Sequence, residues 1–144
     1  GNIHCFPAEG SDISNGNFER ITTLSREAMD IAFGFSIAHI GINAIDQNSA
    51  FSVAKQLEAS MGLPLRETSA SYFAGTGVEI MKSLYRGTNG HVAIQTCNVE
   101  RAISLLEKKG FTIDPESVRV KDGNPIFAYI HEEIGGFAFH LTQK

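Results

Sequence analysis

The chain has 144 residues, of which 42% are hydrophobic and 19% are charged, an ordinary balance for one globular domain with a real core. Its net charge of −4 argues against nucleic acid as the main partner, and no apolar run approaches the roughly 20 residues that span a bilayer. The N-terminus lacks the basic and apolar regions of a secretory signal. With only Cys5 and Cys97 we expect neither a disulfide framework nor a zinc-thiolate site, and we place the protein in a reducing cytoplasm.

Residues 1–34 are predicted to form a loose lead-in followed by one amphipathic helix. Asn17 is a plausible helix cap, and Gly34 ends the run. Helical spacing is shared by the apolar residues Phe18, Ile21, Leu24, Ala28 and Ala32. This stripe needs a surface on which to pack. We expect it to pack on the domain that follows, on the second copy in a homodimer, or on an upstream domain of which these residues would be the tail.

A first module is predicted over residues 35–83. The strand at 37–43 alternates, so that His39, Gly41 and Asn43 share one face and the aliphatic residues share the other. A helix follows and stops at Gly62; its stripe is Ala50, Ala54, Leu57 and Met61. Strands are then expected at 63–67, 71–74 and 78–82.

A second module over residues 91–144 repeats the order of the first. His91, Ala93 and Gln95 share one face of its opening strand, and Asn98 caps a helix that ends at Gly110. Further strands are expected at 111–113, 117–120, 125–130 and 136–143. The fold is therefore predicted to be α+β, with residues 35–144 forming two tandem βαβββ modules in one curved mixed sheet.

Polar residues at matching positions of the two modules predict a shared site. Glu79 and His140 each stand inside an apolar closing strand. If the following helix covers the branched aliphatics of each opening strand, His39 and His91 must point to the opposite face. Beside these histidines the small residues Gly41 and Ala93 leave room for a cavity. We therefore expect His39, Glu79, His91 and His140 to converge, although any one of these histidines alone would be an ordinary core or surface residue.

Imidazole nitrogens and a carboxylate oxygen suit Zn, Ni, Co, Mn or Fe(II). Such an ion can polarise a carbonyl group and stabilise an enediolate, and Glu79, if it dissociated from the ion, could act as a catalytic base. Further along the same face, Asn43 and Gln95 are candidate substrate-binding residues. Arg86, in the linker between the modules, is the arginine that we expect to hold an anionic carbonyl or carboxylate substrate, ahead of Arg66 and Arg119.

Residues 35–144 resemble the vicinal oxygen chelate superfamily, which includes glyoxalase I, methylmalonyl-CoA epimerase, extradiol dioxygenases and bleomycin-resistance proteins. The resemblance is carried by the segments His39-Ile40-Gly41-Ile42, Val78-Glu79-Ile80-Met81, His91-Val92-Ala93-Ile94 and 135–141. It implies a metal cup whose ligands come from the opening and closing strands of both modules. The last position of the glyoxalase pattern is usually a glutamate, whereas this chain has His140 there. This departure puts the usual catalytic base in question, and with it the lactoylglutathione chemistry of glyoxalase I.

Residues 15–28 resemble the closing helix of the 2-keto-3-deoxy-6-phosphogluconate/4-hydroxy-2-oxoglutarate aldolases. This resemblance implies the C-terminal domain of a bacterial aldolase-like protein, joined to a fused barrel. Two classes of function therefore stay open. One is a metal-dependent lyase, isomerase or epimerase that acts on a small oxo- or hydroxy-acid. The other is a non-catalytic domain that binds a metabolite or serves an aldolase.

Overall fold

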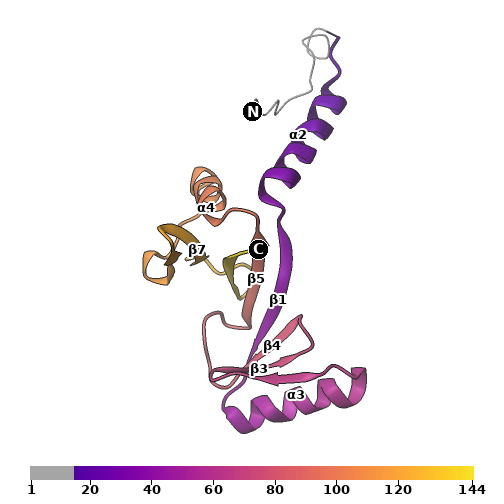
Figure 1. The fold of residues 1–144 in the computed structure, drawn as a ribbon, viewed down its shortest axis with the longest axis vertical. Helices are drawn as coiled ribbons and strands as arrows, with labels where there is room; N and C mark the ends of the chain where they lie inside the picture. Colours follow the sequence, from indigo (N-terminus) through magenta and orange to yellow (C-terminus); the bar gives the residue numbers. More distant parts are fainter. Residues whose placement is uncertain (1–14) are drawn as a thin grey trace.

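The computed structural model describes residues 15–144, which form three α-helices and one eight-stranded sheet (Figure 1). The predicted lead-in falls largely outside these residues. In chain order the elements are α2 (Phe18–Phe33), β1 (Ser36–Asn43), α3 (Gln47–Met61), β2 (Leu65–Glu67), β3 (Ser71–Ala74), β4 (Val78–Met81), β5 (Gly90–Thr96), α4 (Val99–Lys108), the short 3-10 turn η1 (Pro115–Ser117), β6 (Arg119–Lys121), β7 (Asn124–Tyr129) and β8 (Phe137–Gln143). None of the helices in this part of the chain has the length and apolar character needed to span a bilayer.

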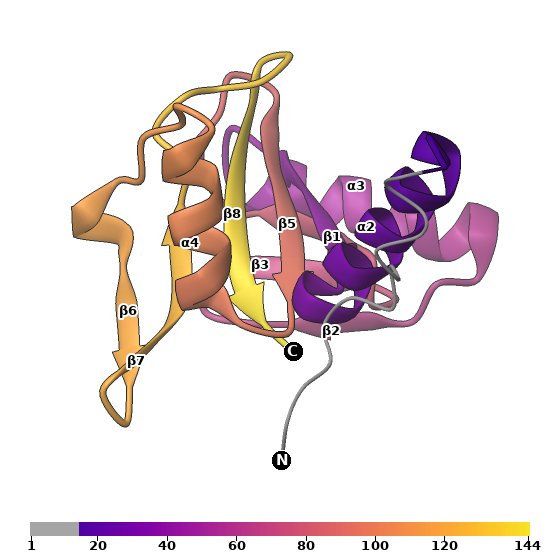
Figure 2. The same cartoon turned by 90° about the horizontal axis from the view of Figure 1, so that it is seen from above.

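The sheet shows the predicted duplication directly. Its strand order is β2-β3-β4-β1-β5-β8-β7-β6, so each module occupies one half (Figure 2). In each half the opening strand pairs in parallel with the closing strand, β1 with β4 and β5 with β8. The two opening strands pair with each other in antiparallel fashion at the centre. The predicted α+β fold of two modules is confirmed.

Local capping chemistry explains where the helices begin and end. The side chain of Asn17 accepts a hydrogen bond from the backbone N–H of Arg20, and that of Asn98 does the same for Arg101. Gly34 follows α2 in the left-handed region, with φ of 54°, which a residue without a Cβ adopts at little cost. Gly34 therefore marks the junction between α2 and β1, and Asn98 marks the junction between β5 and α4.

Each module has its own apolar core between its helix and its sheet. Helix α3 covers β2, β3 and β4, with Ala50, Ala54 and Ile80 fully buried beneath it. In the second module α4 covers β7 and β8, with Val99 and Ala102 buried against Leu141. Figure 1 shows the two helices well apart, α3 at the bottom beside β3 and β4, and α4 at the left beside β7.

One prediction about helix coverage is wrong for the first module. Ile40 and Ile42, on the outer face of β1, stay 42% and 37% exposed. The reason is that α3 packs over the later strands of its module, whereas β1 lies at the centre of the sheet, between the two helices. Ile94 on β5 is better covered, because it packs against the cluster under α4.

The second module also contains one strand fewer than its sequence predicts. Residues 111–113 form only a single isolated bridge, between Ile113 and Ile130. The backbone is instead held by Glu132, whose carboxylate accepts from the N–H of Thr112, and by the η1 turn that begins at Pro115. This loss of one strand restores the match to the first module.

Helix α2 extends away from the sheet (Figure 1), and none of its residues is buried. Phe18 is 69% exposed and Ile31 is 81% exposed. At its C-terminal end, Phe33 packs against the cluster under α4, and its carbonyl accepts hydrogen bonds from Cys97 and Thr96. Of the predicted stripe, Phe18 is exposed and the other members are partly buried, namely Ile21, Leu24, Ala28 and Ala32.

Candidate metal centre

Three side chains meet at one point on the inner face of the sheet. Nε2 of His39 lies 3.3 Å from Nε2 of His91, and both nitrogens face the same carboxylate oxygen. Oε2 of Glu79 is 3.2 Å from His39 Nε2 and 3.1 Å from His91 Nε2. The three atoms form a nearly equilateral triangle, contributed by β1, β4 and β5.

Strand register explains this convergence. Gly41 on β1 is paired with Glu79 on one side and with His91 on the other, so these residues stand in one row and point to the same face. His39 lies two residues before Gly41 on the same strand and is paired with Ala93. Gly41 is required by space: a Cβ built there would lie 2.0 Å from Cε1 of His91. The small residue predicted to leave a cavity in fact leaves room for an imidazole.

The triangle has the dimensions of a metal site. Ligand atoms placed about 2.0–2.2 Å from a tetrahedral zinc ion stand about 3.3–3.5 Å apart, close to the separations observed here. His140 joins the group, since one ring nitrogen each from His39, His91 and His140 lie within 4.8 Å of one another. The donor set of three imidazoles and one carboxylate suits Zn and other borderline divalent ions.

Two ring nitrogens near the cluster are buried without a partner. His91 and His140 are only 2% and 4% exposed. Nδ1 of each is buried and has no hydrogen-bond partner among residues 15–144. For His91 this atom is not the Nε2 that faces Glu79, so the fit to a divalent ion rests on the spacing of the triangle and on the chemistry of its donors.

Glu79 is held as a carboxylate. Burial raises the pKa of Glu79, but hydrogen bonds from His39, His91 and Ser71 outweigh that effect and keep the pKa well below its usual value. The Ser71 hydroxyl donates to Oε1 over 2.6 Å, and Oε2 is left to face the imidazoles. Thr68 contacts the Ser71 hydroxyl at 2.8 Å and so completes the support. The carboxylate therefore has one oxygen anchored and the other directed at the two imidazoles.

His140 is held as a neutral imidazole. Burial, followed by the nearby rings of His91 and His39, lowers the pKa of His140 from 6.5 to about 3. The His140 ring packs 4.5 Å from Phe127 and 4.9 Å from Tyr129, measured between ring centroids. A neutral imidazole has a lone pair available for a metal ion, so this environment suits a ligand.

The candidate substrate-binding residues are already engaged by the protein. The Asn43 amide donates to the carbonyl of Gly87 over 2.9 Å and to that of Tyr85 over 3.2 Å, which ties β1 to the linker. Gln95 donates to the Ser36 hydroxyl over 2.9 Å. Arg86 forms an ion pair with Asp114 at 2.6 Å. The structure thus gives all three residues a structural partner and leaves their role toward a substrate as a prediction.

Sequence reasoning missed the shell around the cluster. Ser71 is 1% exposed and Tyr129 is 3% exposed, and both touch predicted ligands. Phe73 packs edge-on against His39, with 5.6 Å between the ring centroids. Alternation carried a usable signal for Ser71 and Phe73, since both fall on one face of β3, and Phe73 is paired directly with Glu79.

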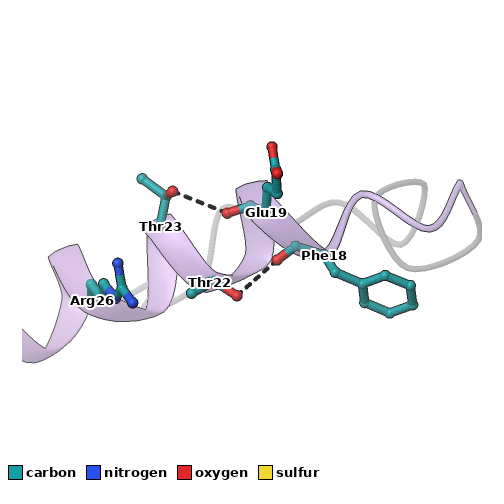
Figure 3. Close-up of a pocket in the computed structure, with 5 residues that line it drawn as sticks. All are labelled: Phe18, Glu19, Thr22, Thr23 and Arg26. Atoms are coloured by element: carbon teal, nitrogen blue, oxygen red, sulfur yellow. Dashed lines mark hydrogen bonds between the residues drawn. The ribbon is translucent and has the colours of Figure 1, made fainter.

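A second hollow lies along α2, away from this cluster (Figure 3). It is lined by Phe18, Glu19, Thr22, Thr23 and Arg26. The hydroxyls of Thr22 and Thr23 donate to the carbonyls of Phe18 and Glu19 in the same helix, as Figure 3 shows. The two threonine hydroxyls are thus used by the helix itself.

Solved structures support the fold. Methylmalonyl-CoA epimerase from Mycobacterium tuberculosis is 15% identical, with a TM-score of 0.54 over 74% of this chain and 86% of that one. The Streptomyces coelicolor methylmalonyl-CoA epimerase, in complex with 2-nitronate-propionyl-CoA, is 16% identical, with a TM-score of 0.55 over 75% and 96%. A hypothetical protein from Bacillus halodurans is 18% identical, with a TM-score of 0.54 over 76% and 94%. At these identities the likeness shows the glyoxalase-like fold alone. No protein-family model matches the chain, and no curated protein matches it.

Proposed function

We propose that this protein is a metal-dependent isomerase, epimerase or lyase that acts beside the carbonyl or carboxylate of a small oxo- or hydroxy-acid. The observation that carries the proposal is the triangle of His39, Glu79 and His91, whose spacing and inner-face position suit a divalent ion. His140 is the fourth proposed ligand. A bound Zn, Ni, Co, Mn or Fe ion would supply a Lewis acid for the negative charge that develops on a substrate oxygen.

Glu79 is the proposed catalytic residue. Its low pKa keeps it ionised, and only Oε1 is committed to Ser71. If Oε2 dissociated from the ion, it could accept a proton from the carbon next to a substrate carbonyl. Return of that proton to a neighbouring atom would give isomerisation, whereas epimerisation would also need a proton delivered from the face opposite Glu79. Because the His140 imidazole is neutral, it adds no positive charge that would lower the affinity of Glu79 for a proton.

Solved epimerases of this fold are seen in complex with CoA-linked ligands, methylmalonyl-CoA and 2-nitronate-propionyl-CoA. An acid linked to CoA is therefore one form of substrate to test beside the free acids. We propose a bacterial, cytoplasmic protein, since the exposed free thiol of Cys97 suits a reducing compartment.

A hydrogen-exchange experiment tests the proposal. The protein is loaded with Zn, Mn or Co and incubated in D₂O with methylmalonyl-CoA and with small 2-oxo and 2-hydroxy acids, and deuterium uptake is followed by NMR. We expect uptake at the carbon beside the carbonyl that stops on chelation and returns with metal. His91→Ala should abolish metal binding and exchange without unfolding the chain, whereas His131→Ala, at an exposed position, should change neither. Full metal content in the His91→Ala protein would reject the proposed site.

A second function is favoured by the exposed apolar residues of α2. A helix that exposes Phe18 and Ile31 has apolar surface available for a partner. This surface supports a non-catalytic or accessory role beside a fused aldolase barrel, or a homodimer. Sedimentation of the chain alone, and of the chain mixed with such a barrel, would distinguish the homodimer from the complex with the barrel. Absence of metal uptake together with barrel binding would favour the accessory role over catalysis.

A further inference from the structure

The outer face of the sheet, opposite the imidazole cluster, has a gap in its helical cover. Helix α3 packs over β2, β3 and β4, and α4 packs over β7 and β8. Within residues 15–144 neither helix extends over β1 at the centre of the sheet or over the side of β5 next to it. The gap is up to two strands wide, about 10 Å, since neighbouring strands lie about 4.8 Å apart. One further helix, about 10 Å across, would close it.

The gap exposes branched aliphatic side chains. Ile37, Ile40 and Ile42 on β1 are 63%, 42% and 37% exposed. Ile40 is paired with Val92 and Ile37 with Ile94, so these side chains share the outer face, and Ile42 joins them by alternation. These five residues are named the central strip. An exposed apolar surface of this kind marks a site that another element covers.

Helix α2 has the length and the polarity to cover the central strip. Its 16 residues extend over about 24 Å, and the 8 residues of β1 extend over about 26 Å. Helical spacing gathers the apolar residues of α2 on one side and its charged residues on the other. On the apolar side Phe18, Met29 and Ile31 are 69%, 39% and 81% exposed, and no residue of α2 is fully buried. One chain therefore carries both an open strip and an amphipathic helix of matching length.

The direction of α2 keeps it from the strip of its own chain. Phe33, at the C-terminal end of α2, packs against the cluster under α4. Its carbonyl accepts hydrogen bonds from the Cys97 N–H over 2.8 Å and from the Thr96 hydroxyl over 2.6 Å. Only Gly34 and Phe35 separate this fixed end from β1, and α2 continues beyond the end of β1, away from the sheet (Figure 1). A helix that closes the strip therefore comes from another molecule.

We propose that two copies of this chain exchange their α2 helices, so that α2 of each copy packs on the central strip of the other. Each copy offers one helix and one strip, and such a reciprocal contact closes after two subunits. A short connection such as Gly34-Phe35 favours exchange of an element between copies. Two helices and two strips together cover about 1,000 Å², the size at which a specific interface is expected. The exchange concerns the outer face and does not depend on the function proposed for the inner face.

Sedimentation velocity of the full chain tests the association, with metal content and circular dichroism measured on the same samples. We expect the wild type to be a dimer. Ile40→Gln places an amide in the strip and Ile31→Gln places one on the helix. Because each contact occurs twice in the dimer, either substitution should weaken association about a hundredfold or more. Val120→Gln, at a 59% exposed position on β6, is the matched control and should leave the dimer intact. A monomeric wild type, or a dimer that survives either substitution, would overturn the proposal.

Cross-linking distinguishes the exchange from a helix that folds back onto its own strip. In a Cys5→Ser, Cys97→Ser background, one protein carries Leu24→Cys near the middle of α2, and a second carries Ile40→Cys near the middle of β1. A short bismaleimide should join the two proteins into a covalent heterodimer after mixing, identified by its mass. A chain that carries both cysteines should likewise form covalent dimers. A cross-link within one monomer of that chain would place α2 on its own strip and reject the exchange.

Discussion

Replacing Gly41 with alanine should empty the metal site without changing any proposed ligand. The added Cβ would lie 2.0 Å from Cε1, 2.2 Å from Nδ1 and 2.4 Å from Nε2 of His91. Normal contacts between such atoms begin near 3.4 Å, so the His91 ring must move by more than an ångström. That displacement exceeds what a metal–imidazole bond tolerates, since plausible ligand distances vary by only about 0.2 Å.

The expected magnitudes follow from this overlap. Overpacking of a close-packed interior costs about 1–3 kcal/mol, which a folded domain can survive. Metal affinity should fall further than the about 10- to 100-fold that loss of a supporting group causes, because a ligand itself is displaced. Affinity is measured by competition with a chelating dye, ligand geometry by the absorption spectrum of the Co-loaded protein, and folding by circular dichroism.

Gly77→Ala is the matched control, because a Cβ at that glycine meets no atom within 4 Å. It should leave metal affinity and folding unchanged. In a His91→Ala background, Gly41→Ala should have little further effect on metal affinity, because the ring that it would strike is gone. Wild-type metal affinity in the Gly41→Ala protein would refute the proposed position of the His91 imidazole.

Three further outcomes are expected. Ser71→Ala removes the 2.6 Å hydrogen bond to Glu79, so metal affinity should fall about 10- to 100-fold with little change in far-UV circular dichroism; unchanged affinity would show that the hydroxyl does not support the ligand. Arg86 lowers the pKa of Asp114 below 3.8. The difference in melting temperature between wild type and Arg86→Met should therefore be full above pH 3.8 and should vanish as the pH falls through the lowered pKa of Asp114. A difference that persisted in acid would contradict this pairing. Deletion of residues 1–29 should change association or stability while metal stoichiometry stays constant, and loss of metal would instead make α2 part of the site.

Alternation in the sequence predicted the inner face well because it depends only on strand geometry. Once 37–43 and the segment that begins at His91 are strands, successive side chains must point to opposite sides. His39, Gly41 and Asn43 therefore share one face irrespective of how the modules are arranged, whereas Glu79 joins that face through its pairing with Gly41. Capping residues such as Asn17 are equally local, since a cap acts within one turn of its helix.

What covers the outer face could not be predicted in the same way. Alternation assigns Ile40 and Ile42 to the face opposite His39, but it does not say which element packs on that face. The answer depends on β1 pairing with β5, a contact between strands about 50 residues apart that places β1 between the two helices. Ser71 was not predicted for a similar reason, because its role depends on the hydrogen bond that its hydroxyl donates to Glu79 on the neighbouring strand.

The pairing of the two opening strands explains why a duplicated module makes a site that one module lacks. His39 is opposite Ala93 and His91 is opposite Gly41, so each histidine faces the small residue of the other module. Room for each ring is therefore provided across the module boundary, and neither half contains the ligand triangle alone. The copies differ where the proposed chemistry needs them to differ. Glu79 closes one module and His140 the other, so only one side of the cluster carries a carboxylate. A substrate held between them would meet the Glu79 carboxylate on one side and the His140 imidazole on the other, so a fold with near two-fold symmetry would present two different groups to it.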